Sequence, residues 1–179
     1  MANELHIGSD IIQAGLLKTR VSGRMEVFKS KNSSNIAIVD YAHNKLSYEA
    51  LFSSVLKEYA GHKIVTVFGC PGNKAYQRRL ELPQIAEKYS DYIFITEEDH
   101  GEESLSKINS EILANIQDKA KAEIVGDREE AIMRALKKYD ENTVILILGK
   151  GRETRQKRGN DYICTESDVN LVKKFWEEI

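Results

Sequence analysis

Four short stretches of the chain are almost continuously apolar and rich in β-branched residues, namely residues 35–40, 63–68, 91–96 and 143–148. A strand with one side facing solvent alternates apolar and polar residues, so continuous runs predict strands that are covered on both faces. Between and after them, apolar side chains recur at three- and four-residue spacing, which predicts helices over residues 47–59, 82–89, 104–117 and 128–139. This alternation predicts an α/β fold with a mostly parallel sheet and helices on both faces.

Weaker signals add further elements to this pattern. Residues 123–125 and 162–164 each predict a short additional strand, and a last helix is predicted from Ser167. Asp127 lies three residues before Glu130, which is the spacing of a capping box. The fourth helix is therefore expected to begin directly after Asp127.

The first segment of the chain differs from the rest. Residues 10–18 have a helical pattern but no neighbouring segment to pack against, and residues 19–23 have the character of a connector. We therefore expect residues 1–23 to be the tail of a preceding domain with its connector, and residues 24–179 to form one domain.

Composition narrows the class of protein. A length of 179 residues with 41% hydrophobic residues is enough for one domain with a real core. The net charge of −2 argues against a nucleic-acid partner, and no apolar run approaches the roughly 20 residues that span a bilayer. Cys70 and Cys164 are far apart and form no zinc motif, which fits a reduced compartment. We expect a soluble cytoplasmic protein with no nucleic-acid or membrane partner.

Polar residues follow each of the four main predicted strands. They form the segments Asp40-Tyr-Ala-His43, Gly69-Cys-Pro-Gly-Asn-Lys74, Glu97-Glu-Asp-His100 and Gly149-Lys-Gly-Arg-Glu153. Taken singly, each has an ordinary explanation as a cap, a turn or a solvated charge cluster. Because ligands of open parallel sheets bind beyond the carboxyl ends of the strands, the four segments together predict a binding site there.

General nucleotide-binding motifs are absent from these segments. The stretch from Gly69 to Gly72 lacks the GxGxxG spacing of dinucleotide-binding folds, which disfavours a dehydrogenase. Gly149-Lys150 follows a strand, but Val144 and Gly151 occupy places where a phosphate loop needs glycine and serine or threonine. The chain has no self-sufficient ATP site of either type.

Five ordered motifs carry a resemblance to a known family. They are Ser22-Gly-Arg-Met-Glu-Val-Phe28, Asp40-Tyr-Ala-His43, Val67-Phe-Gly-Cys70, Asp127-Arg-Glu-Glu-Ala131 and Gly149-Lys-Gly-Arg-Glu153 with Gln156. In this combination the chain resembles the Mur ligases, and most closely the branch that adds the third residue of the peptidoglycan stem peptide. The resemblance implies a Rossmann-like fold and the third of three domains. The N-terminal and central domains, which bind the UDP-sugar substrate and ATP, are not among these residues.

The resemblance also implies an activity. ATP phosphorylates the terminal carboxylate of a UDP-sugar dipeptide, and the amine of the incoming amino acid attacks the acyl phosphate. ATP and Mg²⁺ are held mainly by the central domain, so no catalytic residue and no metal ligand are expected in this chain. The small-molecule partners are the UDP-sugar dipeptide, the amino acid and ATP.

The family's functional positions fall on two sets of residues. Arg24, Asp40 and His43 match positions that face the nucleotide when the domains close. Positions around the incoming amino acid match Lys74, Arg78, Arg79, Gly149 and Glu153, and which arginine makes contact stays open. Cations suit the α-carboxylate of that substrate, and the carboxylate of Glu153 suits an ammonium group.

The segment after the third strand departs from the family pattern. Diaminopimelate-adding relatives carry Asp-Asn-Pro-Arg where this chain has Glu98, Asp99, His100 and Gly101, so the arginine that pairs with the second carboxylate is missing. A pocket with acids in place of that cation favours a side chain ending in ammonium. Glu98 and Asp99 therefore join the predicted amino-acid site, with L-lysine as the expected substrate. Two alternatives stay open: a folylpolyglutamate synthetase-type domain, and a non-catalytic binding or regulatory module of the same fold.

Overall fold

The computed structural model describes the whole chain except residues 1–3, 5–6, 19–20, 22 and 178–179. Its strands are β1 (Glu26–Lys29), β2 (Ile36–Asp40), β3 (Lys63–Phe68), β4 (Tyr92–Ile95), β5 (Ala122–Ile124), β6 (Thr143–Leu148), β7 (Arg155–Arg158) and β8 (Asp161–Cys164). Its α-helices are α1 (Ser9–Lys18), α2 (Lys45–Glu58), α3 (Arg78–Tyr89), α4 (Leu105–Ala114), α5 (Arg128–Leu136) and α6 (Asp168–Glu177), with a short 3₁₀ helix η1 at Lys119–Lys121.

Six strands form one sheet in the order β1-β2-β6-β3-β4-β5. All neighbours pair in parallel except β1, which is antiparallel to β2 at the edge. All residues of β2 and β6 are buried, as expected for strands covered on both faces. The predicted α/β fold with a mostly parallel sheet is confirmed.

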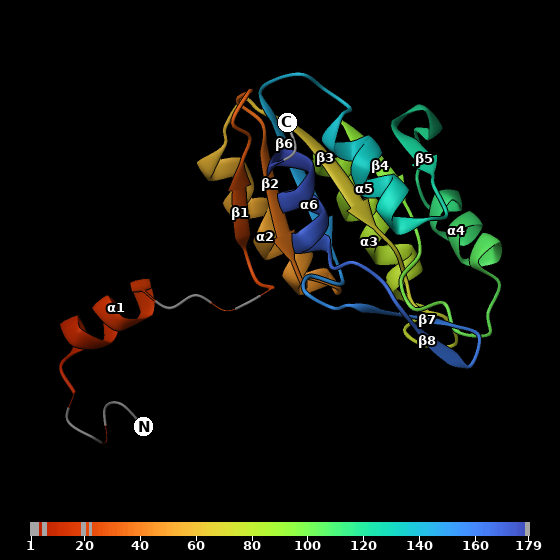
Figure 1. Ribbon diagram of the computed structural model, residues 1–179, viewed down its shortest axis with the longest axis horizontal. Helices are drawn as coiled ribbons and strands as arrows, with labels where there is room; N and C mark the ends of the chain where they lie inside the picture. Colours follow the sequence, from red (N-terminus) through yellow and green to blue (C-terminus); the bar gives the residue numbers. More distant parts are fainter. Residues whose placement is uncertain (1–3, 5–6, 19–20, 22, 178–179) are drawn as a thin grey trace.

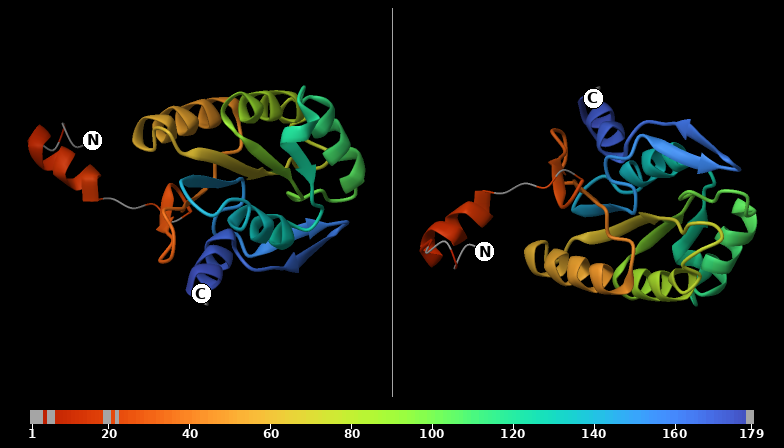
Figure 2. Two further views of the ribbon diagram at one scale, coloured as in Figure 1. Left: turned by 90° about the horizontal axis from the view of Figure 1, so that it is seen from above. Right: turned by 90° about the horizontal axis from the view of Figure 1, so that it is seen from below.

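Helices cover both faces of this sheet (Figures 1 and 2). On one face, α2, α3 and α4 contribute side chains such as Phe52, Leu82 and Ile112 to one apolar cluster. On the other face, α5 and α6 contribute Ile132 and Val172 to a second cluster. The sheet separates two apolar cores, so neither face of its central strands is exposed to solvent.

Register brings the carboxyl ends of four strands level with one another. Asp40 pairs with Leu148 at the ends of β2 and β6, and Phe68 pairs with Ile95 at the ends of β3 and β4. Just beyond, the amide of Gly149 donates to the carbonyl of Asp40 at 3.1 Å. The polar segments that follow these strands therefore emerge at one edge of the sheet.

Two parts of the chain lie outside the sheet. The α1 helix is set apart from the sheet (Figure 1), and much of the predicted connector lies outside the described residues. The β7–β8 hairpin projects beside the strand ends and is tied to the loop after β4, where the amide of Gly101 donates to the carbonyl of Lys157 at 3.1 Å. This hairpin becomes one wall of a cavity described below.

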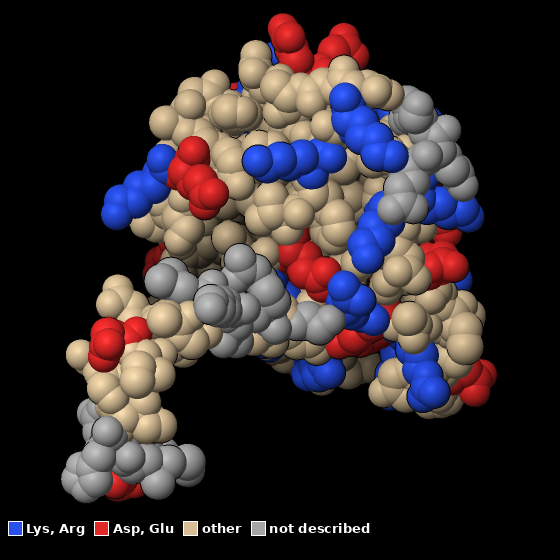
Figure 3. Space-filling view, turned by 60° about the vertical axis from the view of Figure 1, so that its left-hand side comes forward, with Lys and Arg blue, Asp and Glu red and all other residues tan. Residues whose placement is uncertain are grey.

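The main predicted elements are present, with some differences. The edge strand β1, the hairpin strand β7 and the short helix η1 were not predicted. Helix α3 begins four residues before the predicted start at residue 82, and α4 and α5 each end three residues before the predicted ends at residues 117 and 139. Asp127 caps α5 as expected, accepting a hydrogen bond from the amide of Glu130 at 2.9 Å. None of the described helices is long and apolar enough to cross a membrane. On the face shown in Figure 3, acidic and basic side chains are interspersed.

Candidate functional site

A hollow of about 180 Å³ lies where the four strand ends meet. It is lined by Tyr41, His43, Pro71, Lys74, Arg78, Glu98, Asp99, Gly149, Lys150 and Glu153. These residues come from the segments after β2, β3, β4 and β6, which is the crevice where open parallel sheets bind ligands. Its volume is below the roughly 300–1,000 Å³ of typical ligand pockets, so a further surface is needed to enclose a ligand fully.

Most of the residues predicted from the sequence line this hollow. Seven of the ten do so, namely His43, Lys74, Arg78, Glu98, Asp99, Gly149 and Glu153. The three that do not are Arg24, Asp40 and Arg79. The structure therefore brings seven of the ten predicted residues together, and their role in binding a ligand stays a prediction.

The carboxylate of Glu98 is the most unusual group in the hollow. Its residue is only 8% exposed, and no hydrogen bond or ion pair reaches the carboxylate from the residues that the structure describes. Burial raises the pKa of Glu98 to about 7, although the positive charges of Arg128, Arg78 and Lys150 oppose this shift. A buried, unpaired acid at the wall of a cavity is suited to receive a cation from a ligand.

Gly149 makes room for this carboxylate. Its φ of +107° is a conformation that side-chain-bearing residues rarely adopt, and an added Cβ would overlap Oε2 of Glu98. Gly149 therefore shapes the hollow through its missing side chain, and its place next to Glu98 explains why glycine is needed at the end of β6.

Lys150 organises the other two acids of the hollow. Its ammonium lies 2.9 Å from Oδ1 of Asp99 and 2.6 Å from Oε2 of Glu153, and its side chain is 5% exposed. The hydroxyl of Tyr41 donates to Oε1 of Glu153 at 2.5 Å, which raises the pKa of Tyr41 to about 12. Asp99 and Glu153 are therefore held in place and partly neutralised, whereas Glu98 is not.

Two cations also belong to the lining of the hollow. Lys74 is exposed and Arg78 is half-buried, and neither forms an ion pair with a described residue. Both line the hollow. The hollow thus offers unpaired positive groups and one unpaired negative group, an arrangement that complements the two charges of a zwitterion.

Arg79 has a different place from the one predicted. It is 3% exposed and its guanidinium donates to Glu103 at 2.6 and 2.9 Å, to Glu111 at 2.6 Å and to the carbonyl of Pro71 at 3.0 Å. These bonds hold the segment after β3 against the loop before α4 and lower the pKa of Glu103 to about 2. Of the two arginines left open by the sequence, Arg78 is the one that reaches the hollow.

The three residues expected near a nucleotide lie around the end of β2. The guanidinium of Arg24 is 5.0 Å from the centroid of the Tyr41 ring and forms no ion pair with a described residue. Both carboxylate oxygens of Asp40 accept backbone amides, from Met25 and Ala42, at 2.7 Å each. Nδ1 of His43 lies 2.7 Å from the carbonyl of Tyr41. Arg24 is thus available to an anion. Asp40 fixes the backbone at Met25 and Ala42, which are the residues next to Arg24 and Tyr41.

The sequence analysis gave no role to Lys150 and Tyr41, which the structure places in the hollow. Both stand inside motifs that were singled out, next to Gly149 and Asp40. The contacts of Tyr41 with Glu153 and of Lys150 with Asp99 join segments that follow different strands, so only the register of the sheet could have revealed them. Among the described residues, no cluster of His, Cys, Asp and Glu could hold a metal ion.

Comparison with models of known protein families gives a match over most of the Rossmann-like sheet. Residues 23–151 match the family described as Mur ligase, glutamate ligase domain. The chain belongs to the Mur ligase family, and the resemblance seen in the sequence is confirmed.

Similar curated proteins come from the branch that adds the third residue of the stem peptide. The chain is 36% identical to UDP-N-acetylmuramyl-tripeptide synthetase of Ligilactobacillus salivarius, over 90% of this chain and 32% of the relative. It is 37% identical to UDP-N-acetylmuramoyl-L-alanyl-D-glutamate--2,6-diaminopimelate ligase of Aquifex aeolicus, over 94% of this chain and 34% of the relative. It is 33% identical to UDP-N-acetylmuramoyl-L-alanyl-D-glutamate--L-lysine ligase of Streptococcus pyogenes, over 96% of this chain and 36% of the relative. The chain thus spans about a third of the length of these relatives.

A solved structure shares the fold. The structure of a UDP-N-acetylmuramoyl-L-alanyl-D-glutamate--2,6-diaminopimelate ligase aligns with a TM-score of 0.78 at 20% identity, covering 98% of this chain and 38% of that chain. At this identity the likeness concerns the fold alone.

Proposed function

We propose that this chain is the amino-acid-binding C-terminal domain of an ATP-dependent ligase that adds L-lysine to UDP-N-acetylmuramoyl-L-Ala-D-Glu in peptidoglycan synthesis. In this proposal residues 24–179 form the domain, and residues 1–23 are the tail of a preceding domain with its connector. The ligase works in the cytoplasm, and N-terminal and central domains bind the UDP-sugar dipeptide and most of the ATP. Relatives that add the third residue support this function over a folylpolyglutamate synthetase-type domain.

One observation carries the choice of substrate. Glu98 is a buried carboxylate without a partner among the described residues, and it faces a hollow whose other acids, Asp99 and Glu153, are already bonded to Lys150. Lysine and diaminopimelate both carry a distal ammonium that can neutralise Glu98, but diaminopimelate has a second carboxylate beside it, which would add repulsion at Glu98. The charge of the hollow therefore favours lysine.

The remaining groups give the substrate its orientation. Lys74 and Arg78 bind the α-carboxylate, and Glu98 binds the side-chain ammonium, so the molecule is held at both ends. ATP, when bound, supplies the phosphoryl group that activates the carboxylate of the dipeptide, and Mg²⁺ offsets its charge. Arg24, which has no ion pair with a described residue, and His43 would face the phosphates. The contribution of this domain to the rate is positioning of the amine.

Phosphate release by the protein expressed from the complete gene tests this function. With UDP-N-acetylmuramoyl-L-Ala-D-Glu and ATP, we expect L-lysine to support turnover and diaminopimelate to support at least about tenfold less, the loss for one unmatched charge of roughly 1.4 kcal/mol. Glu98→Gln should raise the KM for lysine at least tenfold. Glu102→Gln is the matched control, because Glu102 is an exposed acid in the same loop that does not line the hollow. No turnover with any amino acid, or equal turnover with both, would contradict the proposal.

A further inference from the structure

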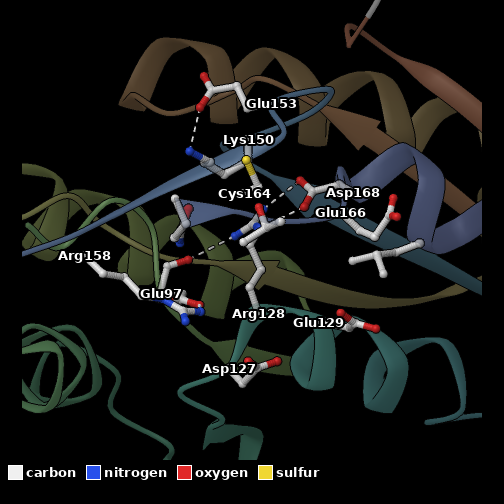
Figure 4. Close-up of a pocket in the computed structure, with 13 residues that line it drawn as sticks. Glu97, Asp127, Arg128, Glu129, Lys150, Glu153, Arg158, Cys164, Glu166 and Asp168 are labelled. Carbon is white, nitrogen blue, oxygen red and sulfur yellow. Dashed lines mark hydrogen bonds and ion pairs between the residues drawn. The ribbon is translucent and has the colours of Figure 1, made fainter. Parts of the chain in front are cut away.

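A second and larger cavity, of about 480 Å³, borders the segment that carries Lys150 and Glu153 (Figure 4). Its walls are the β7–β8 hairpin, the first turns of α5 and α6, and the start of the loop after β4. It shares only Lys150 and Glu153 with the 180 Å³ hollow. The function proposed above makes no use of this space.

Negative charge exceeds positive charge in this cavity. Its three cations are each bonded to an acid: Arg128 to Asp168, Arg158 to Glu97, and Lys150 to Glu153 (Figure 4). Three further carboxylates line the cavity, those of Asp127, Glu129 and Glu166. None of the three forms an ion pair with a described residue, although Asp127 caps α5 and Glu166 accepts a hydrogen bond from the side-chain amide of Asn170. A ligand that enters therefore meets uncompensated negative charge.

Gln156 supplies an independent sign that a ligand binds here. It lines the cavity from β7 and is 2% exposed. Both its amide nitrogen and its amide oxygen lack a hydrogen-bond partner among the described residues. Buried amides are nearly always bonded, because an unpaired donor or acceptor destabilises the folded state. An unpaired amide in a cavity wall is explained if a bound molecule provides its partners.

We propose that this cavity is a second binding site for a small organic cation that carries an ammonium group together with a carboxyl or amide group, such as a free basic amino acid. The ammonium pairs with the carboxylates at the rim, and all three of these residues, Asp127, Glu129 and Glu166, are exposed. The carboxyl or amide group bonds with the amide of Gln156 after a rotation of that side chain. Since Glu153 borders both cavities, a molecule held here lies next to the proposed substrate hollow.

An NMR titration of the ¹⁵N-labelled chain tests this site separately from the first. The backbone amides of Cys164 and Thr165 report on the large cavity, and the amide of Lys74 reports on the hollow. L-Lysine should shift both sets of signals. Norleucine, which lacks the side-chain ammonium, and L-glutamate should bind at the large cavity at least tenfold more weakly. Equal or tighter binding of norleucine or glutamate at Cys164 and Thr165 would overturn the proposal.

Variants make the test independent of the proposed function. Gln156→Met should weaken lysine binding at the Cys164 and Thr165 signals at least tenfold and should raise Tm by about 2–4 °C, because the unpaired amide is gone. Arg78→Gln should leave these signals unchanged while weakening binding at the Lys74 signal. Loss of the Cys164 response in Arg78→Gln, or undiminished binding in Gln156→Met, would refute a second site even if lysine fills the hollow. If Gln156→Met does not fold, the double variant Glu129→Gln/Glu166→Gln replaces it, with Glu49→Gln outside the cavity as the control. A several-fold loss of lysine affinity at the Cys164 and Thr165 signals in the double variant alone supports the second site, and no loss refutes it.

Discussion

The pH dependence of stability offers a sharp test of Glu98. Its pKa lies at about 7 in the folded state, against 4.5 for an ordinary glutamate. Below pH 4.5 both states keep the proton, and Glu98 carries no penalty. Between pH 4.5 and about 7 the folded state holds a proton that the unfolded state has lost, so the free energy of unfolding falls as the pH rises. Above pH 8 the full penalty applies, roughly 3 kcal/mol at most.

Glu98→Gln removes this titration while nearly keeping the shape of the side chain. We expect the variant and the parent chain to differ little near pH 4.5, and the variant to gain by up to about 3 kcal/mol at pH 8. Urea unfolding followed by circular dichroism at several pH values between 4.5 and 8.5 measures this difference, because the other titrating groups cancel between the two proteins. A difference that does not change with pH would show that Glu98 is not a buried, unpaired acid. Adding L-lysine at pH 8 should stabilise the parent chain more than the variant.

Three other substitutions separate structural roles from binding roles. Arg79→Met breaks a buried ion-pair cluster and should lower the free energy of unfolding by roughly 3–5 kcal/mol in urea titrations without abolishing lysine binding; unchanged stability would contradict its assignment. Gly149→Ala should lower lysine affinity at least tenfold in calorimetry as well as lowering Tm, whereas Gly159→Ala, at a positive φ with open space around it, should lower Tm only. Lys74→Ala should weaken lysine binding about tenfold with Tm unchanged, as one lost charge-assisted bond predicts, and Lys57→Ala is the control that should alter neither.

The central strands could be predicted because they are buried on both faces and so are apolar throughout. The edge strand β1 escaped prediction because its four residues alternate between exposed and half-buried positions and pair on one side only. Strand β7 has one buried residue, Gln156, which is polar, so no apolar pattern marks it. The start of α3 was missed because its first turn carries Arg78 and Arg79 and its one apolar residue, Leu80, is exposed. Periodicity detects elements through the side chains they bury, and these segments bury few apolar ones.

The part of the candidate site that consists of residues directly after the strands could be predicted from the sequence. Once four parallel strands are recognised, the residues after them must meet at one edge, and Lys74, Glu98, Asp99 and Glu153 do. The choice between Arg78 and its neighbour depended on the rotation of a helix, which the sequence alone did not fix.

A crystal structure of the chain grown with L-lysine tests the central claim most directly. The account predicts lysine in the 180 Å³ hollow, with its side-chain nitrogen about 3 Å from the carboxylate of Glu98 and its α-carboxylate facing Lys74 and Arg78. A lysine bound with its carboxylate toward Glu98, or a hollow that stays without lysine at saturating concentration, would contradict it.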